Sequence, residues 1–155
     1  MNVLIAEELD RLHQLITWEM PAVPSPGSVA GEACVWCHLP PGDTAVDLVV
    51  GMPRRGCADC YTTRLAWLVS WYDWHDHVRA CVSCQQARTC HVGRGRRALH
   101  ERTVALASQR PLRCVSCHQL ALASQLVLPV LWEGTSSDHL GYGHTLCMVR
   151  RATTR

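Results

Sequence analysis

Ten cysteines determine what chemistry this 155-residue chain can perform. Eight of them form four C-x2-C pairs, which begin at Cys34, Cys57, Cys81 and Cys114. A two-residue gap lets two thiolates of one tight turn reach the same tetrahedral ion, so two such half-sites complete a zinc site. In a reducing cytoplasm, where we expect this chain to reside, cysteines at such spacings indicate metal ligation before disulfides.

The spacing groups the cysteines into three ligand sets, and each set reaches four ligands once a nearby histidine is added to the second and third. The sets are Cys34, Cys37, Cys57 and Cys60; His77, Cys81, Cys84 and Cys90; and Cys114, Cys117, His144 and Cys147. His75 competes with His77 for the second set, and His139 competes with His144 for the third. This grouping uses all ten thiols, and we therefore predict three zinc ions per chain.

Four protein ligands close a zinc site, whereas a catalytic zinc keeps one position open. The chain has no H-E-x-x-H, no G-x-S-x-G and no phosphate loop, and the adjacent pair His100-Glu101 lacks the His-x-Glu spacing of deaminases. The sequence thus predicts structural zinc, no enzymatic activity and no small-molecule substrate.

Two segments resemble known zinc families. The pattern C-x2-C-x19-C-x2-C from Cys34 to Cys60, with the run Leu48-Val-Val-Gly51 before the second pair, resembles the zinc-binding domain of the ClpX unfoldase. The pattern His77-x3-Cys81-x2-Cys84 resembles the core motif of zinc-containing anti-sigma factors. Both resemblances imply a protein-docking role, and the first implies a treble-clef finger.

The same cysteines allow two other interpretations. The spacing of Cys60, Cys81, Cys84 and Cys90 resembles that of WhiB-like iron–sulfur regulators, which would make the protein a redox regulator. Cys34–His38 and Cys114–His118 also match C-x-x-C-H, the attachment motif of c-type haem. Haem attachment normally requires export, and no signal peptide is visible in the chain.

The elements that must position these ligands are short. Periodicity predicts an amphipathic helix over 3–18, a strand within 45–50, helices over 61–74 and 96–109, and an apolar segment over 120–132 that fits strand or helix. Trp67, Trp71 and Trp74 form a stripe that we expect in the core. The three sequences that begin at Cys34, Cys81 and Cys114 look like copies of one metal-holding turn.

We therefore predict a small, metal-stabilised α+β fold built from treble-clef-like zinc fingers with short hairpins and helices. The predicted divisions are an N-terminal helix (1–20), a linker (21–30), a four-cysteine finger (31–76), a basic segment with the second site (77–110) and a last finger (111–155).

Charge is distributed unevenly along the chain, whose formal net charge is +2. Residues 1–78 carry ten acids against four Arg, whereas 79–113 carry eight Arg against Glu101 alone. The Arg-rich segment, with a Gly-flexible loop over Gly93–Arg97, suits a phosphate backbone. The residues predicted to bind nucleic acid are Arg88, Arg94, Arg96, Arg97, Arg102, Arg110 and Arg113.

Two function classes follow from this distribution. The first is a nucleic-acid-binding zinc-finger regulator that uses the Arg-rich segment. The second is a protein–protein adaptor that uses the N-terminal helix and the acidic region, in which case the Arg-rich segment is only a solvated face. The sequence pI of about 8.1 lies below the value above 9 typical of dedicated nucleic-acid binders. No apolar run is long enough for a membrane span, so we expect a cytoplasmic protein without a membrane partner.

Overall fold

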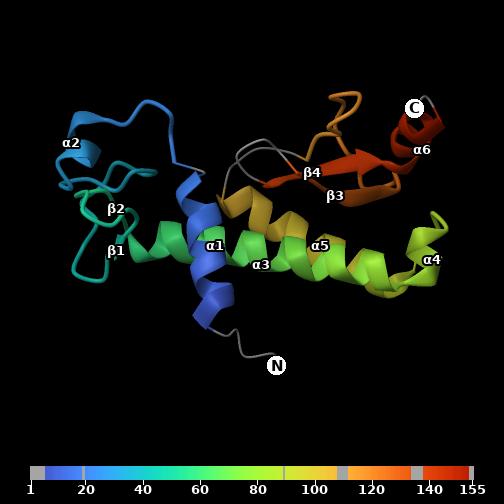
Figure 1. Ribbon diagram of the computed structural model, residues 1–155, viewed down its shortest axis with the longest axis horizontal. Coiled ribbons are helices and arrows are strands. Elements are labelled where there is room, and N and C mark those ends of the chain that lie inside the picture. Colours follow the sequence, from blue (N-terminus) through green and yellow to red (C-terminus); the bar gives the residue numbers. More distant parts are fainter. Residues whose placement is uncertain (1–5, 19, 89, 108–111, 134–137, 154–155) are drawn as a thin grey trace. The chain divides into compact units, whose positions relative to one another are not determined.

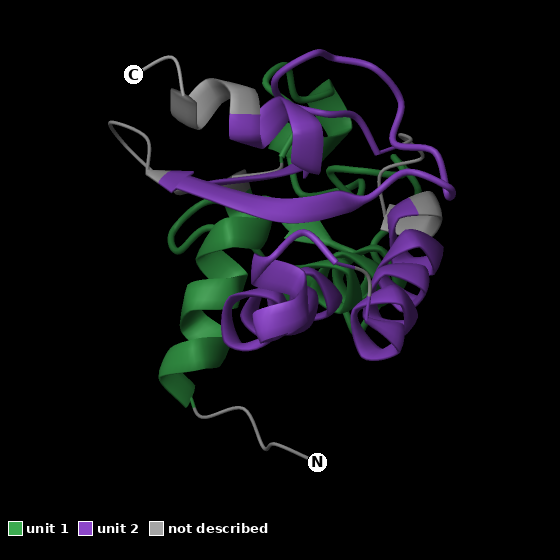
Figure 2. Ribbon diagram, turned by 90° about the vertical axis from the view of Figure 1, so that its right-hand side faces the viewer, with its two compact units in different colours: residues 1–68 green, residues 69–155 purple. Residues whose placement is uncertain are grey.

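The computed structural model describes residues 6–18, 20–88, 90–107, 112–133 and 138–153. The chain divides into two compact units, Met1–Leu68 and Val69–Arg155 (Figure 2). Both units combine helices with a short antiparallel hairpin, which is the α+β class predicted from the sequence. Within the described residues, no helix is both long and apolar enough to cross a bilayer.

The first unit begins with α1 (Ala6–Trp18), whose apolar side chains Leu12, Leu15 and Ile16 are buried. The segment predicted as a linker contains a one-turn helix, α2 (Pro26–Val29). This helix forms because proline is well suited to the first helical position and because the Ser25 hydroxyl caps the turn by accepting the Ser28 N–H.

The hairpin of the first unit pairs β1 (Val46–Asp47) with β2 (Arg55–Gly56), and Val46 lies opposite Gly56. The strands lead directly into α3 (Ala58–Ala80), a 23-residue helix. A Cβ on Gly56 would lie 2.4 Å from the indole of Trp36, so only glycine allows this strand to approach the Trp36 ring.

The predicted aromatic stripe of α3 is core at two of its three positions. Trp71 is fully buried and Trp74 is 2% exposed, whereas Trp67 is half-buried. Among the other apolar residues of the same helix, Leu68 is 1% exposed and belongs to the core, whereas Val69 is 37% exposed. Large aromatic surfaces are the most costly to leave in water, so they determine which face is buried.

The second unit continues with α4 (Val82–Gln85), α5 (His91–Ala107), β3 (Val127–Glu133), β4 (Asp138–His144) and α6 (Thr145–Thr153). The C-terminal half of α3 runs antiparallel beside α5 (Figure 1), where Ser70 Oγ lies 2.8 Å from His100 Nδ1. The β3–β4 hairpin contacts α3, where Trp71 Nε1 donates a hydrogen bond to the Gly141 carbonyl at 3.3 Å. The ambiguous segment over 120–132 is therefore a strand from Val127 onward.

The predicted flexible loop over Gly93–Arg97 is wrong, because these residues form the first turns of α5. The Gly93 N–H donates to Cys90 Sγ at 3.1 Å, and a Cβ at this position would lie 3.2 Å from Cys84 Sγ. Gly93 thus leaves room for the sulfur atoms of Cys84 and Cys90 and does not serve as a hinge.

Candidate metal centres

Three clusters of Cys and His side chains could each hold a metal ion. In each cluster the four candidate ligand atoms all lie within 4.8 Å of one another. The clusters are Cys34, Cys37, Cys57 and Cys60 in the first unit, and His77, Cys81, Cys84 and Cys90 together with Cys114, Cys117, His144 and Cys147 in the second. We call them the first, middle and third clusters.

The spacing of the ligand atoms matches one tetrahedral ion. With zinc–sulfur bonds of about 2.3 Å, two thiolates of a tetrahedron lie about 3.8 Å apart. Sγ of Cys37 lies 3.8 Å from Sγ of Cys57, and the Cys90 sulfur lies 3.9 Å from Cys81 and 3.6 Å from Cys84. All ten cysteines are free thiols, so no disulfide competes for them.

Each histidine of these clusters directs one ring nitrogen at the thiols. Nε2 of His77 lies 3.1 Å from Cys90 Sγ, and Nδ1 of His144 lies 3.4 Å from Cys117 Sγ. The competing histidines have other neighbours, since His75 stacks on Trp71 and His139 stacks on Trp132.

The first and third clusters begin with the same tight turn, which we call the knuckle (residues 34–39 and 114–119). In each knuckle the N–H of the first Cys donates to the carbonyl of the residue five positions later. The Cys34 N–H donates to the Leu39 carbonyl at 2.8 Å, and the Cys114 N–H donates to the Gln119 carbonyl at 2.9 Å. The residue after the second Cys takes a left-handed conformation, with φ of 62° at His38 and 60° at His118. Both histidine side chains are exposed.

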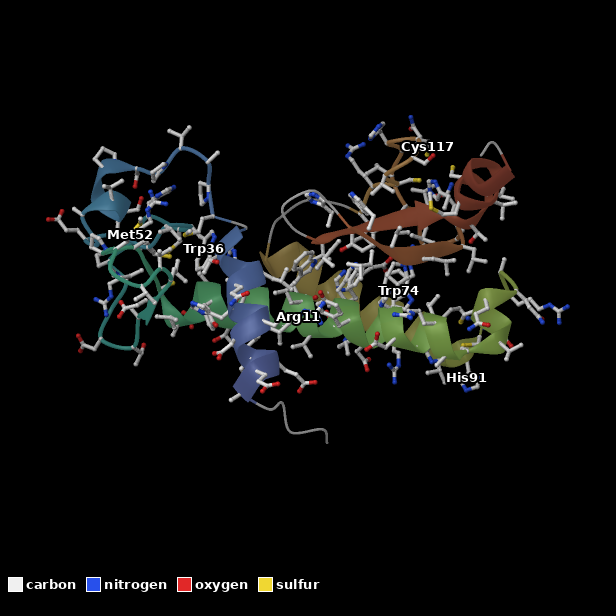
Figure 3. All side chains as sticks on the ribbon, in the orientation of Figure 1. Arg11, Trp36, Met52, Trp74, His91 and Cys117 are labelled. Atoms are coloured by element: carbon white, nitrogen blue, oxygen red, sulfur yellow. The ribbon has the colours of Figure 1, made fainter. Side chains whose placement is uncertain are left out.

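A hairpin and a helix complete both clusters in the same way. The Cys57 N–H donates to Cys34 Sγ, and the His144 N–H donates to Cys114 Sγ, both at 3.4 Å. The last ligands, Cys60 and Cys147, lie in the first turns of α3 and α6. Figure 3 labels Cys117, which lies in the knuckle of the third cluster, beside α6.

The environment of the knuckles favours the thiolate form of their first cysteine. Burial raises the pKa of Cys34, but backbone N–H groups of Cys37, Cys57 and Trp36 outweigh it and lower the pKa to about 7. Burial likewise raises the pKa of Cys114, and N–H groups that include those of His144 and Cys117 lower it to about 6. Thiolates are the form that binds a metal ion.

The middle cluster uses a different turn, so the prediction of three equivalent turns is wrong. Cys81 is the N-cap of α4, and Cys84 lies within that helix. The left-handed residue is Ala87, three positions after the second Cys. Burial and the neighbouring thiols of Cys90 and Cys81 raise the pKa of Cys84 to about 12, so a bound cation would favour the thiolate form of Cys84.

Gln125 supports the third cluster, although no motif in the sequence indicates it. Nε2 of His144 lies 3.0 Å from Gln125 Oε1. An imidazole that donates one ring N–H to such an acceptor presents its other nitrogen to a metal. This hydrogen bond fixes Nδ1 of His144 as the atom that faces Cys117 and Cys147.

The sequence analysis also missed a buried polar chain in the second unit. His100 is fully buried, and its Nε2 lies 2.6 Å from the Tyr142 hydroxyl while its Nδ1 faces Ser70 Oγ. Trp74, labelled in Figure 3, packs beside this chain, with its ring centroid 5.9 Å from that of His100 and 6.3 Å from that of Tyr142. The chain connects α3 and α5 to the strand that ends at His144.

We expect Tyr142→Phe to reduce the free energy of unfolding by about 1–3 kcal/mol, because it leaves a buried imidazole nitrogen without its hydroxyl partner. Urea unfolding of the metal-loaded protein measures this reduction. Tyr61→Phe removes a half-buried hydroxyl that lies 2.9 Å from His13 Nδ1 and provides a matched control with a smaller expected effect. Equal effects for both variants would contradict a special role for the buried chain.

The Arg-rich segment separates into two groups. Arg88, Arg94, Arg102 and Arg113 are exposed. Arg96 instead pairs with Asp73 at 2.6 Å, and Arg97 is 9% exposed and pairs with Glu101 at 2.8 Å. Arg110 lies outside the described residues.

Comparisons with family models, curated proteins and solved structures found no match for the chain. The resemblances to ClpX-type and anti-sigma domains are therefore not supported by any relative. The structure also places Cys60 with Cys34, Cys37 and Cys57, which is not the ligand grouping of the WhiB-like interpretation.

Proposed function

We propose that this protein is a non-enzymatic, zinc-stabilised regulator that binds nucleic acid through its second unit. Four thiolates, or three thiolates and an imidazole, at tetrahedral spacing are the donor sets that zinc prefers. The order of knuckle, hairpin and ligand-bearing helix in the first and third clusters supports the proposal of treble-clef-like fingers. Zinc in all three clusters would hold short elements together and leave the surface for recognition.

One observation carries the nucleic-acid proposal, namely that three exposed arginines of the second unit have no counter-charge among the side chains that the structure describes. The three carboxylates of this unit whose side chains are described each face a basic side chain: Asp73 faces Arg96, Asp76 faces His75 and Glu101 faces Arg97. Among the described side chains, Arg88, Arg94 and Arg102 form no ion pair. Guanidinium groups free of carboxylates suit phosphate oxygens.

The double variant Arg94→Ala/Arg102→Ala tests this surface. We expect weaker binding to DNA and RNA, and a slope of log affinity against log salt that is shallower by about 0.7–0.9 for each phosphate that the variant no longer neutralises. Salt titration by fluorescence anisotropy measures both. Arg11→Ala/Arg54→Ala removes the same charge from the first unit and is the control. A parent protein that binds no nucleic acid at low salt would contradict the proposal.

The zinc scheme predicts three zinc ions per chain. Elemental analysis of protein purified without added metal and without oxygen measures this, together with an absorbance spectrum. Substitution by Co²⁺ should give the visible absorption of tetrahedral thiolate sites. One metal ion per chain, or iron with visible absorption in the purified protein, would contradict the scheme.

An adaptor that binds a protein is the second candidate function. Apolar side chains near the β1–β2 turn are exposed in the first unit, with Val50 fully exposed and Met52 53% exposed. Such side chains suit contact with a protein more than contact with phosphate. Under this function we expect Arg94→Ala/Arg102→Ala to keep its binding to a protein partner, and Val50→Ser/Met52→Ser to lose that binding.

A further inference from the structure

The second unit contains a cavity of about 400 Å³ beside the middle cluster. Its walls come from α3, from α5 and from residues 123–128, and Cys84 and Cys90 also reach it. The apolar part of the lining includes Trp74, Val78, Ala98, Val127 and Leu128. Pockets that hold small organic molecules begin at about 300 Å³, so this volume admits one planar ring system.

The charged groups of the cavity divide into a neutral pair and two arginines that have no ion pair among the described residues. Glu101 accepts from Arg97 Nε at 2.8 Å, and Arg97 also donates to the carbonyl of Leu122 at 2.9 Å, so this pair is fixed in the wall. Arg88 and Arg94 line the same cavity, are exposed, and form no ion pair with the described residues. An anionic group is therefore favoured at the exposed side of the cavity, next to its apolar part.

Polar groups that could read a base lie in the same wall. Ser124 and Gln125 line the cavity. Gln125 Oε1 already accepts from the Leu122 N–H and faces His144, whereas the Gln125 Nε2 group has no hydrogen-bond partner among the described residues. An amide donor beside an apolar cavity suits the carbonyl or ring-nitrogen edge of a nucleobase.

We propose that this cavity binds a phosphorylated nucleoside, with the base in the apolar space and the phosphate on Arg88 and Arg94. The proposal rests on the nucleic-acid function above and narrows it, because a base that is stacked and paired in a duplex cannot enter a cavity. The protein then prefers single strands. A free nucleotide carries the same chemistry and is the other source of this ligand.

Ala98→Leu tests the cavity without changing charge and with little change in helix propensity. Ala98 lines the cavity on α5, so a leucine there fills part of the space. Ala66→Leu is the matched control, since Ala66 is an exposed alanine of α3 in the first unit. The probes are a short single-stranded DNA, its duplex and AMP, with affinities from anisotropy and calorimetry.

We expect the parent to bind the single strand about tenfold or more above the duplex, because base stacking and burial contribute about 1–3 kcal/mol per base. Ala98→Leu should remove that preference and leave duplex binding unchanged, while Ala66→Leu behaves as the parent. Ala123→Leu fills the cavity from residues 123–128. If Ala98→Leu loses its metal ions, the single-strand preference of Ala123→Leu tests the cavity in its place.

The outcomes separate the two proposals. Equal affinities for single strand and duplex, unchanged in Ala98→Leu and with no AMP bound, overturn the cavity proposal but leave nucleic-acid binding standing. AMP binding that both filling variants abolish, without binding of DNA or RNA at low salt, supports the cavity and overturns the nucleic-acid function. Binding of none of the three probes, and of no RNA, overturns both.

Discussion

Replacing Cys114 by serine is expected to unfold the third cluster and to disrupt most of the packing of the second unit. Cys114 is fully buried, and its Sγ accepts the His144 N–H, so it connects the knuckle to the ligand at the end of β4. Zinc binding by a small structural site contributes about 10 kcal/mol or more at neutral pH, which is comparable with the whole stability of a domain. Zinc content and thermal unfolding by circular dichroism measure the effect.

His118→Ala is the control for this variant, because His118 directly follows the second Cys of the same knuckle and is exposed. We expect three zinc ions and a free energy of unfolding within about 1 kcal/mol of the parent. His118→Gly should be as stable or slightly more stable, because φ is 60° at this position and glycine adopts it without steric cost. Unfolding of His118→Ala as severe as that of Cys114→Ser would instead assign His118 a ligand role, as in C-x-x-C-H.

The residues that the sequence groups by spacing lie together in the three clusters, because metal chemistry restricts such residues locally. Two thiolates two residues apart can meet one ion in few backbone conformations, so the pairs at Cys34 and Cys114 already indicate knuckles. The choice between His75 and His77 needed the structure, since both follow Trp74 closely in α3. The ring of His75 stacks on Trp71, and this packing leaves His77 to face the thiols.

The fold around the middle cluster could not be predicted from local sequence rules. Gly93 and Gly95 lie among arginines, a composition typical of a loop, yet they belong to α5. Tertiary contacts outweigh the poor helix propensity of these residues, since Gly93 packs against the sulfurs of Cys84 and Cys90. The same reasoning explains the missed chain of Ser70, His100 and Tyr142, whose members are far apart in sequence.

Arg97→Ala is expected to destabilise the second unit by about 3 kcal/mol, whereas Arg94→Ala changes its stability by less than about 0.5 kcal/mol. The two arginines lie three residues apart on α5 and were given the same role by the sequence. Arg97 is 9% exposed and donates to Glu101 and to the carbonyls of Leu122 and Gln125, the last at 2.5 Å. Its removal leaves a carboxylate and two carbonyls without their donor.

Urea unfolding of both variants, loaded with zinc, measures this difference. Arg97→Lys should recover little of the stability, because one ammonium group cannot reproduce three hydrogen bonds made by a planar guanidinium. Similar unfolding midpoints for Arg94→Ala and Arg97→Ala would show that the contacts of Arg97 contribute no stability.

For nucleic-acid binding we expect the opposite order, in which Arg94→Ala has the larger effect and Arg97→Ala the smaller. Arg94→Ala should weaken binding at full stability and lower the salt slope, because its guanidinium is exposed and has no carboxylate partner among the described residues. Arg97→Ala, compared at an equal folded fraction, should keep the salt slope of the parent, since its charge is already neutralised by Glu101. A lowered salt slope in folded Arg97→Ala would mean that this guanidinium leaves Glu101 to meet a phosphate.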